Sequence, residues 1–357
     1  MKIISYILWI FIISFIFLLS CSNKISRTKS SELVIFPSPP DTTRIQYLTS
    51  IRSSLDITGG RSGFVKMIIG EETDYPIQKP YGISVVKNKI FICDTKLNGI
   101  EIIDLDKKTF ENFTPGGRGV LKKPINCFVD NNLLLYVVDV ERKDIVVFDK
   151  NLKYYNSFGD ELLEKPTDVF GYKDKIYVCD IKAGKINIFS GNDYSLIKSF
   201  PDADTSEPQF LHQPTNIYIK NDRIYITDFG EFHIKEFDLD GNYIKSISSY
   251  GRGVGQLVRP KGIALDNDDN LYVVDAAFEN VQIFNPNGDI LMYFGGSYKG
   301  EGYMYMPAKV AIDYENLDYF RDFVDPAFDL KYLIFVTNQF GPDKITVYGF
   351  VEPKPVR

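Results

Sequence analysis

Five aspartates and one asparagine recur at matching places along the chain and could form a ring of oxygen ligands. Each closes a short apolar run, and the six are Asp94, Asp139, Asp180, Asp228, Asp275 and Asn338. Such a ring could bind a cation such as Ca²⁺. An Asp at the end of a strand also accepts hydrogen bonds from the backbone of the following turn. Because every repeat carries the residue, the sequence favours the structural role, since a metal site normally draws different residues from different repeats.

Histidines are too few for a zinc site with several His ligands. The chain has two, His212 and His233, both in the fourth repeat. They could relay a proton, but two histidines so placed are more often surface or loop residues. No G-x-S-x-G, H-E-x-x-H or P-loop pattern occurs. The sequence therefore predicts no catalytic residue, no metal site and no cofactor, and indicates a protein that is not an enzyme.

Three cysteines lie within the repeats. Cys93 and Cys179 occupy the same position in the first and third repeats, and Cys127 lies at the start of the second. A disulfide needs Cα atoms within about 7 Å, which equivalent positions two repeats apart should not satisfy. We expect all three to be small buried hydrophobes, with a disulfide or redox role as the alternative.

These residues are positioned by a repeat of 42 to 48 residues, each copy of which starts at a proline. The six prolines are Pro80, Pro124, Pro166, Pro214, Pro260 and Pro307. The apolar runs that follow are rich in Val, Ile, Tyr and Phe and are bounded by Gly, Asn, Asp and Pro, as strands are. Several runs are apolar at consecutive positions, so both faces of each sheet should be covered. Four strands and their turns need about 45 residues, which predicts an all-β, six-bladed β-propeller.

The last repeat supplies three strands, so the ring needs a further strand to close. An open sheet edge would expose unpaired N–H and C=O groups. The run from Arg44 to Ile51 (RIQYLTSI) has no earlier partner. We expect it to pair beside residues 345–350 and to supply the outer strand of the last blade.

Residues 250–291, YGRGVGQLVRPKGIALDNDDNLYVVDAAFENVQIFNPNGDIL, resemble an NHL repeat. The G-x-G-x-G-Q lead-in, the P-x-G start and the Y-V-V-D and V-Q-I-F strands are all present. Over about residues 44–351 the chain is similar to bacterial six-bladed NHL-repeat β-propeller lipoproteins. The resemblance implies an NHL-type fold and a cell address more than an activity. Lactonase-like and lyase-like propellers use a channel-mouth calcium or zinc, so a metal-dependent hydrolase or lyase is the alternative function.

The N-terminus has the features of an export signal. Residues 1–20, MKIISYILWIFIISFIFLLS, form one lysine-led apolar stretch. Leu18-Leu19-Ser20-Cys21 resembles the bacterial lipobox, which implies lipid attachment at Cys21. Ser22 resembles the pattern of lipoproteins sent to the outer membrane of a diderm cell. An uncleaved membrane anchor is the alternative.

The chain is thus expected to divide into a signal peptide (1–20), a flexible tether (21–43) rich in Ser, Lys, Thr and Pro, the propeller (44–351) and a tail (352–357). The formal net charge of −6 and pI of about 5.2 give no basic footprint for nucleic acid. We expect an extracytoplasmic protein held at a membrane by its lipid.

Loops joining the second to the third strand, and the fourth strand to the next blade, share one face of a propeller. Binding usually occurs on loops of a rigid scaffold. The residues of this face are Arg118, Glu141, Arg142, Lys182, Phe232, His233, Arg252, Phe278 and Glu279. Mixed charge with aromatic rings favours a peptide or protein partner, although each residue alone is typical of a plain surface loop.

An insertion in the last repeat, residues 313–331, has no counterpart in the other five. Its centre, residues 315–324, has helical spacing, with Leu317, Phe320 and Val324 on one stripe. The stripe could pack on the blade. Alternatively, a helix carrying Tyr319, Phe320 and Phe323 could bind a partner. Together these features predict a non-enzymatic protein- or peptide-binding or scaffolding module of the cell envelope.

Overall fold

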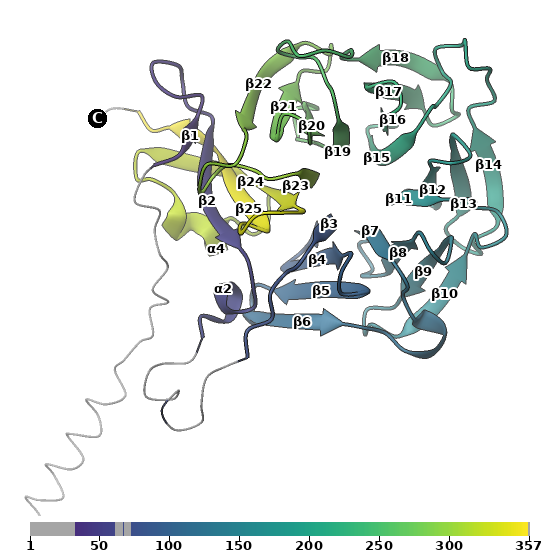
Figure 1. The fold of residues 1–357 in the computed structure, drawn as a ribbon, viewed down its shortest axis with the longest axis horizontal. Coiled ribbons are helices and arrows are strands. Elements are labelled where there is room, and N and C mark those ends of the chain that lie inside the picture. The colour runs from purple at the N-terminus through teal and green to yellow at the C-terminus, as the bar shows by residue number, and fades with distance from the viewer. Residues whose placement is uncertain (1–32, 61–66, 68–72, 356–357) are drawn as a thin grey trace, which may run out of the picture. The chain divides into compact units, whose positions relative to one another are not determined.

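The structure is a computed structural model and describes residues 33–60, 67 and 73–355 (Figure 1). The predicted signal peptide and Cys21 lie outside the described residues. All strands of the described residues belong to one of two compact units, which includes residues 33–58 and 74–355. Within the described residues, no helix is both long and apolar enough to cross a membrane.

Six antiparallel sheets form the blades (Figure 1). Blades 1 and 2 consist of β3 (Pro80–Val86), β4 (Lys89–Asp94), β5 (Gly99–Asp104) and β6 (Thr109–Phe113), and of β7 (Pro124–Val129), β8 (Leu135–Asp139), β9 (Asp144–Phe148) and β10 (Tyr154–Phe158). Blades 3 and 4 consist of β11 (Pro166–Tyr172), β12 (Lys175–Asp180), β13 (Lys185–Ser190) and β14 (Leu196–Phe200), and of β15 (Pro214–Lys220), β16 (Arg223–Asp228), β17 (His233–Asp238) and β18 (Tyr243–Ile247).

Blade 5 consists of β19 (Pro260–Leu265), β20 (Leu271–Asp275), β21 (Asn280–Phe284) and β22 (Ile290–Gly295). Blade 6 combines β23 (Pro307–Asp313), β24 (Phe328–Asn338) and β25 (Ile345–Pro353) with β1 (Ile35–Phe36) and β2 (Ile45–Ile51). The helical turns are α2 (Leu55–Thr58), η1 (Gly117–Gly119), α4 (Leu317–Phe320) and η2 (Arg321–Phe323).

Each innermost strand contacts the innermost strands of both neighbouring blades, so the ring is closed. Some of the middle strands are buried along their whole length. All five residues of β8 and of β9 are buried, whereas the outer strand β10 is mostly half-buried or exposed. Neighbouring blades therefore cover both faces of each sheet, as the consecutive apolar positions predicted. The predicted all-β six-bladed propeller is confirmed.

The ring closes through the N-terminal strand. β2 pairs antiparallel with β25, with Ile51 opposite Ile345 and Ile45 opposite Phe350. This is the pairing that the sequence predicted. β1 adds a further short strand outside β2, with Ile35 opposite Gln46. Part of the segment expected to be a tether is therefore paired into the sheet, because the outer edge of β2 offers it backbone hydrogen-bonding groups.

The end of the chain also extends further into the sheet than expected. β25 continues to Pro353, which lies opposite Phe328 in β24. The insertion lengthens β24 to 11 residues, so β25 has a partner beyond the predicted end of the propeller. Only the last residues of the predicted tail follow the strand.

The insertion forms two short turns, α4 and η2, rather than one continuous helix. Phe320 is 1% exposed and its ring lies 5.7 Å from that of Phe335, so it is a core residue that no partner can reach. Tyr319 and Phe323 are half-buried against the same core. Gln46 of β2 donates to Phe323 O at 3.0 Å and accepts from Asp325 N at 3.0 Å. The insertion is thus fastened to the closing strand.

The recurrent aspartates hold each blade together. The carboxylate of Asp139 accepts from the N–H groups of Lys122 (2.6 Å) and Lys123 (3.1 Å) ahead of the first strand, and from those of Glu141 (3.1 Å) and Arg142 (3.0 Å) in the following turn. Asp94, Asp180 and Asp275 bond to the same two segments of their blades. Asp228 accepts from His212 N and Gln213 N, ahead of the first strand of its blade. Their structural interpretation is confirmed.

Replacing Asp139 by Ala should lower the free energy of unfolding by about 3 kcal/mol, because four partly buried N–H groups lose their fully buried acceptor. Urea denaturation measures the loss. Asp149→Ala is the matched control, since Asp149 accepts two N–H bonds in an exposed turn. We expect the control to lose much less stability, because water replaces its bonds. Equal losses would show that burial of the Asp139 bonds is unimportant.

Glu101 in β5 is 2% exposed, and its Oε2 has no hydrogen-bond partner among the described residues. Burial, reinforced by the neighbouring Asp94, raises the pKa of Glu101 to about 10 from an ordinary value of 4.5. Between these two pH values the folded protein binds a proton that the unfolded chain releases. The free energy of unfolding therefore falls as pH rises through this window.

Glu101→Gln should consequently stabilise the fold, and its advantage over the unmodified protein should grow from pH 5 to pH 9. Thermal unfolding at several pH values measures this. Glu111→Gln, at an exposed position of the neighbouring strand β6, is the control and should show no such trend. An advantage independent of pH would contradict the raised pKa.

Candidate functional site

The first strand of each blade carries an irregularity that determines what faces the channel. After the opening proline the strand pairing shifts, as between Pro166 and Asp168 of β11. The same shift occurs at the start of all six innermost strands. A bulge re-aims the side chains within it. The third residues of the six strands are Gly82, Asn126, Asp168, Asn216, Gly262 and Lys309.

Four of these residues form a polar cluster, which we call the channel plug: Asn126, Asp168, Asn216 and Lys309. The ammonium of Lys309, from blade 6, forms a hydrogen-bonded ion pair with Asp168 of blade 3. Blades 3 and 6 are opposite each other in a six-membered ring, so this pair spans the channel. Asp168 is 0% and Lys309 8% exposed. A long cationic side chain therefore crosses the centre of the propeller.

Hydrogen bonds complete the environment of the Asp168 carboxylate. It also accepts from Val169 N at 3.0 Å, Ile217 N at 3.1 Å and Asn216 Nδ2 at 3.1 Å. Such bonds offset the desolvation of a buried charge pair. Asn126 Nδ2 donates to Thr167 O at 2.7 Å. The plug thereby ties neighbouring blades together as well as opposite ones.

Glycine at Gly82 permits this packing. A Cβ atom there would lie 2.5 Å from Asn126 Oδ1 and 2.6 Å from Asn126 Cα, closer than van der Waals contact allows. The innermost strand of blade 1 can approach Asn126 of blade 2 this closely because Gly82 has no side chain.

The fifth residues of the innermost strands divide the channel into two unlike halves. Blades 2, 3 and 4 carry Phe128, Phe170 and Tyr218, which we call the aromatic wall. The ring centroids of Phe128 and Phe170 are 5.0 Å apart, and those of Phe170 and Tyr218 are 4.9 Å apart. At the same register, blades 5, 6 and 1 carry the small residues Ala264, Ala311 and Ser84. The space that the small residues leave lies inside the ring.

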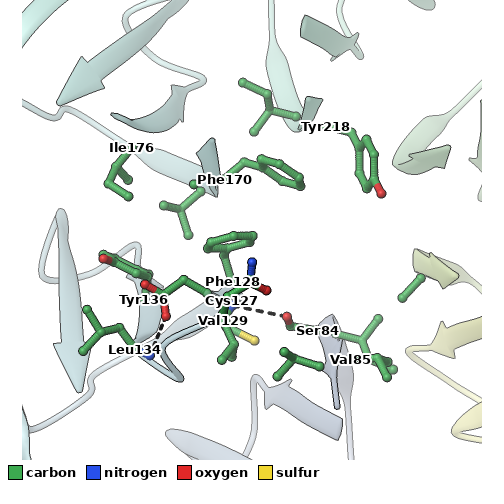
Figure 2. A pocket seen from close by; sticks show the side chains of 18 of the residues that line it. Ser84, Val85, Cys127, Phe128, Val129, Leu134, Tyr136, Phe170, Ile176 and Tyr218 are labelled. Atoms are coloured by element: carbon green, nitrogen blue, oxygen red, sulfur yellow. Dashed lines mark hydrogen bonds between the residues drawn. The ribbon is translucent and has the colours of Figure 1, made fainter. Parts of the chain in front are cut away.

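A cavity of about 620 Å³ occupies this space. It extends from Lys309 past the aromatic wall and the aliphatic side chains of Ile83, Val310 and Ile312 to the loops that hold Asp130 and Asp174. Figure 2 shows Phe128, Phe170 and Tyr218 along one side, with the Tyr218 hydroxyl pointing into the cavity. Burial raises the pKa of Tyr218, so this phenol stays protonated at neutral pH. The cavity size is typical of sites for small organic ligands.

The cavity lies toward the face opposite to the loops that the sequence predicted. Its lining includes loops between first and second strands, at Asp130 and Asp174, and a loop between third and fourth strands, at Asn192. None of the nine predicted ligand-face residues lines it. The residues of the aromatic wall lie within strands whose sequences are typical of a core. Loop topology concerns only residues between strands, so it did not predict them. Those nine residues remain a prediction for a different surface.

Several of the nine have partners within the propeller. Arg142 makes a bidentate ion pair with Asp144 and donates to the carbonyl oxygens of Arg118 (2.9 Å) and Val120 (2.7 Å), which anchors its loop. The Arg118 guanidinium lies 5.0 Å from the ring of Tyr154. Glu141 and Lys182 form surface ion pairs with Lys123 (3.7 Å) and Glu164 (2.7 Å).

The remaining predicted residues lie in blades 4 and 5 and the lead-in to blade 5. The ring of Phe232 lies 4.7 Å from that of Tyr250, and Arg252 is exposed. His233 is half-buried, and burial lowers its pKa. The amide of Phe278 donates to Asp275, and Glu279 accepts from Met306 N at 3.1 Å.

The sequence did hold a signal for the channel plug. Blade 5 starts with the P-x-G of an NHL repeat, at Pro260-Lys261-Gly262, whereas Asn, Asp, Asn and Lys replace that glycine in blades 2, 3, 4 and 6. Comparing the third position of every repeat would have singled out these polar residues. Their contact across the ring could not be inferred without the closed fold.

The structure also tests the predictions for the three cysteines and for a metal site. Cys93, Cys127 and Cys179 are free and buried, as expected, and burial raises the pKa of the Cys93 and Cys179 thiols. Within residues 33–60, 67 and 73–355, no group of three or more His, Cys, Asp or Glu side chains is arranged to hold a metal ion.

Comparison with known proteins supports the fold. Residues 199–289 match the DUF5128 family, described as a 6-bladed beta-propeller. A search of curated proteins gives no significant match. Virginiamycin B lyase from Staphylococcus aureus superposes with a TM-score of 0.51 at 14% identity over 78% of this chain and 86% of that protein.

Two other solved structures are similar. The gluconolactonase XC5397 from Xanthomonas campestris has a TM-score of 0.55 at 14% identity, covering 90% of this chain and 98% of that protein. A protein of unknown function from Bacteroides thetaiotaomicron has a TM-score of 0.56 at 14% identity, covering 78% and 70%. At such identities the likeness shows the fold alone.

These similarities correct one expectation. The sequence indicated a protein that is not an enzyme, and that inference is wrong, because propellers of the same architecture include a lyase and a gluconolactonase. A scaffold without catalytic motifs in its sequence can still carry a reaction in its channel. The family match over residues 199–289 and the closed ring of six sheets together identify the fold as a six-bladed β-propeller, which fits the NHL-type resemblance of the repeats.

Proposed function

We propose that the protein is a lipid-anchored, extracytoplasmic propeller that binds a compact organic molecule in its channel. The observation that supports this is the cavity of about 620 Å³, whose lining includes the aromatic wall and the small residues Ala311 and Ser84 of blades 6 and 1. This lining combines aromatic and aliphatic side chains with polar groups at both ends, Lys309 at the inner end and Asp130 and Asp174 at the loops. Apolar walls with a small number of polar groups that fix orientation are typical of small-molecule sites. Lys309 is the residue of the channel plug that lines this cavity.

The aromatic wall provides the main attraction for such a ligand. Phe128, Phe170 and Tyr218 are each half-buried, so part of each ring faces the cavity. Burying about 200 Å² of apolar ligand surface would contribute about 5 kcal/mol at ~25 cal/mol per Å², before the costs of association. This apolar contribution supports binding only if polar contacts add to it. The ammonium of Lys309 in the channel plug can supply such a contact.

The metal-dependent hydrolase or lyase is less well supported. The described residues hold no cluster of His, Cys, Asp and Glu that fits a metal ion. The centre of the channel instead holds an ion pair whose carboxylate already accepts several hydrogen bonds. The proposal therefore contains no metal-dependent step.

A protein partner on the opposite face is the second candidate. The observation that favours it is the pair of rings of Phe232 and Tyr250, of which Tyr250 is 61% exposed. Exposed aromatic side chains are common in protein interfaces. This surface and the cavity lie on different faces, so both functions are compatible.

Filling the cavity should weaken ligand binding. The neutral dye Nile red should bind with a saturable rise in fluorescence, and Ala311→Phe should weaken its binding at least tenfold, because the new ring occupies the space opposite the aromatic wall. Ala277→Phe, in an exposed loop between second and third strands, is the matched control and should bind normally.

Thermal unfolding shows whether Ala311→Phe folds, and Ser84→Phe, from the neighbouring blade, provides an independent filling variant. Nile red binding that survives in both folded variants would overturn the proposed site.

The lipid anchor has a separate test. A fatty-acid probe should label the protein in bacteria, and Cys21→Ser should lose the label and leave the membrane fraction. Cys93→Ser is the control, since its thiol is buried in the propeller. Labelling of Cys21→Ser at the original level would contradict the anchor.

A further inference from the structure

The chemistry of the inner end of the cavity limits the ligand that the proposed site can take. We infer that the ligand is an uncharged molecule with a flat aromatic body and a hydrogen-bond acceptor, such as a carbonyl oxygen, directed at Lys309. This inference rests on the proposed function and adds the class of ligand.

Hydrogen-bond donors predominate at the inner end. The ammonium of Lys309 has three N–H groups. Among the described residues, the Asp168 carboxylate is a side-chain acceptor for one of them. The Tyr218 hydroxyl points into the cavity (Figure 2). Ser84 Oγ accepts from Val129 N at 3.3 Å, so its own hydrogen can be donated to a ligand. Three side chains of the lining can therefore donate hydrogen bonds to a ligand.

Acceptors at the same end are less available. Both carboxylate oxygens of Asp168 already accept hydrogen bonds. The unpartnered Oδ1 atoms of Asn126 and Asn216 are fully buried, out of a ligand's reach. A ligand that offers only donors would thus find few partners, whereas an acceptor finds several.

The charges disfavour an ionised ligand. Lys309 and Asp168 neutralise each other, so an anion would be desolvated without an unpaired counter-charge. At the loop end, Asp130 and Asp174 line the cavity, while Lys173 is paired with Asp222 at 2.7 Å. An anion would have to pass these carboxylates, and a cation at the inner end would face the ammonium of Lys309.

The aromatic wall accounts for the flat body. Its adjacent rings are tilted by 40° and 54°, with half-buried faces along a continuous surface of three blades. A ligand ring can make offset or edge-to-face contacts with such a wall. The small residues opposite leave room for the thickness of the ligand.

Four probes that share one ring system test the inference: 2-naphthamide, 2-naphthoate, 2-naphthylmethylamine and 2-methylnaphthalene. Each is used to displace Nile red from the full-length protein. We expect 2-naphthamide to bind at least tenfold more tightly than each of the other three. Tighter binding of the carboxylate or the amine, or equal binding of all four, would overturn the inference while leaving the Nile red site intact.

Two variants test the donors. Tyr218→Phe keeps the ring and should weaken 2-naphthamide about threefold without affecting 2-methylnaphthalene. The double variant Lys309→Met with Asp168→Asn keeps the plug uncharged and should remove most of the remaining preference for the amide. If both folded variants retain the full preference, the assigned donors are wrong. Failure of the filling variants to block Nile red would instead refute the site itself.

Discussion

The pairing of β2 with β25 is the interaction on which the other features depend. It joins residues near the start of the described chain to its last strand, and so completes blade 6 beside blade 1. Only in a closed ring do the innermost strands of blades 3 and 6 lie opposite each other, at a distance that Lys309 can span to Asp168. The insertion depends on the same strand, because Gln46 of β2 bonds to Phe323 and Asp325.

Within this ring, one sequence position serves two purposes. The third residue of each innermost strand is glycine where neighbouring strands must approach, as at Gly82, and polar where the channel is blocked, as at Asp168. A buried ion pair contributes little net stability after desolvation, although breaking it is costly. Its position at the centre of the channel is therefore better explained by a role in defining the inner end of the cavity.

The cavity arises from a broken symmetry. If the fifth residue of the innermost strand were the same in all six blades, the channel would be equally wide on every side. Three adjacent aromatic residues, Phe128, Phe170 and Tyr218, face three small ones instead, and the difference in side-chain volume produces an off-centre space with unlike walls. The pattern that recurs in every repeat builds the scaffold, and departures from that pattern provide the site. The lyase and gluconolactonase that share the architecture show how little the scaffold restricts the chemistry.

The blades, their strands, the closing strand and the structural role of residues such as Asp139 could all be predicted from the sequence, because each depends on local periodicity or on a pattern repeated six times. The sequence by itself did not determine the site. Lys309 and Asp168 are 141 residues apart and unremarkable in their own repeats, and Phe128 or Tyr218 alone is an ordinary core residue. The helix predicted for the insertion became two turns because packing of Phe320 and the bonds of Gln46 outweighed helical spacing. Tertiary structure decided these features because they arise from contacts between blades, which no single repeat contains.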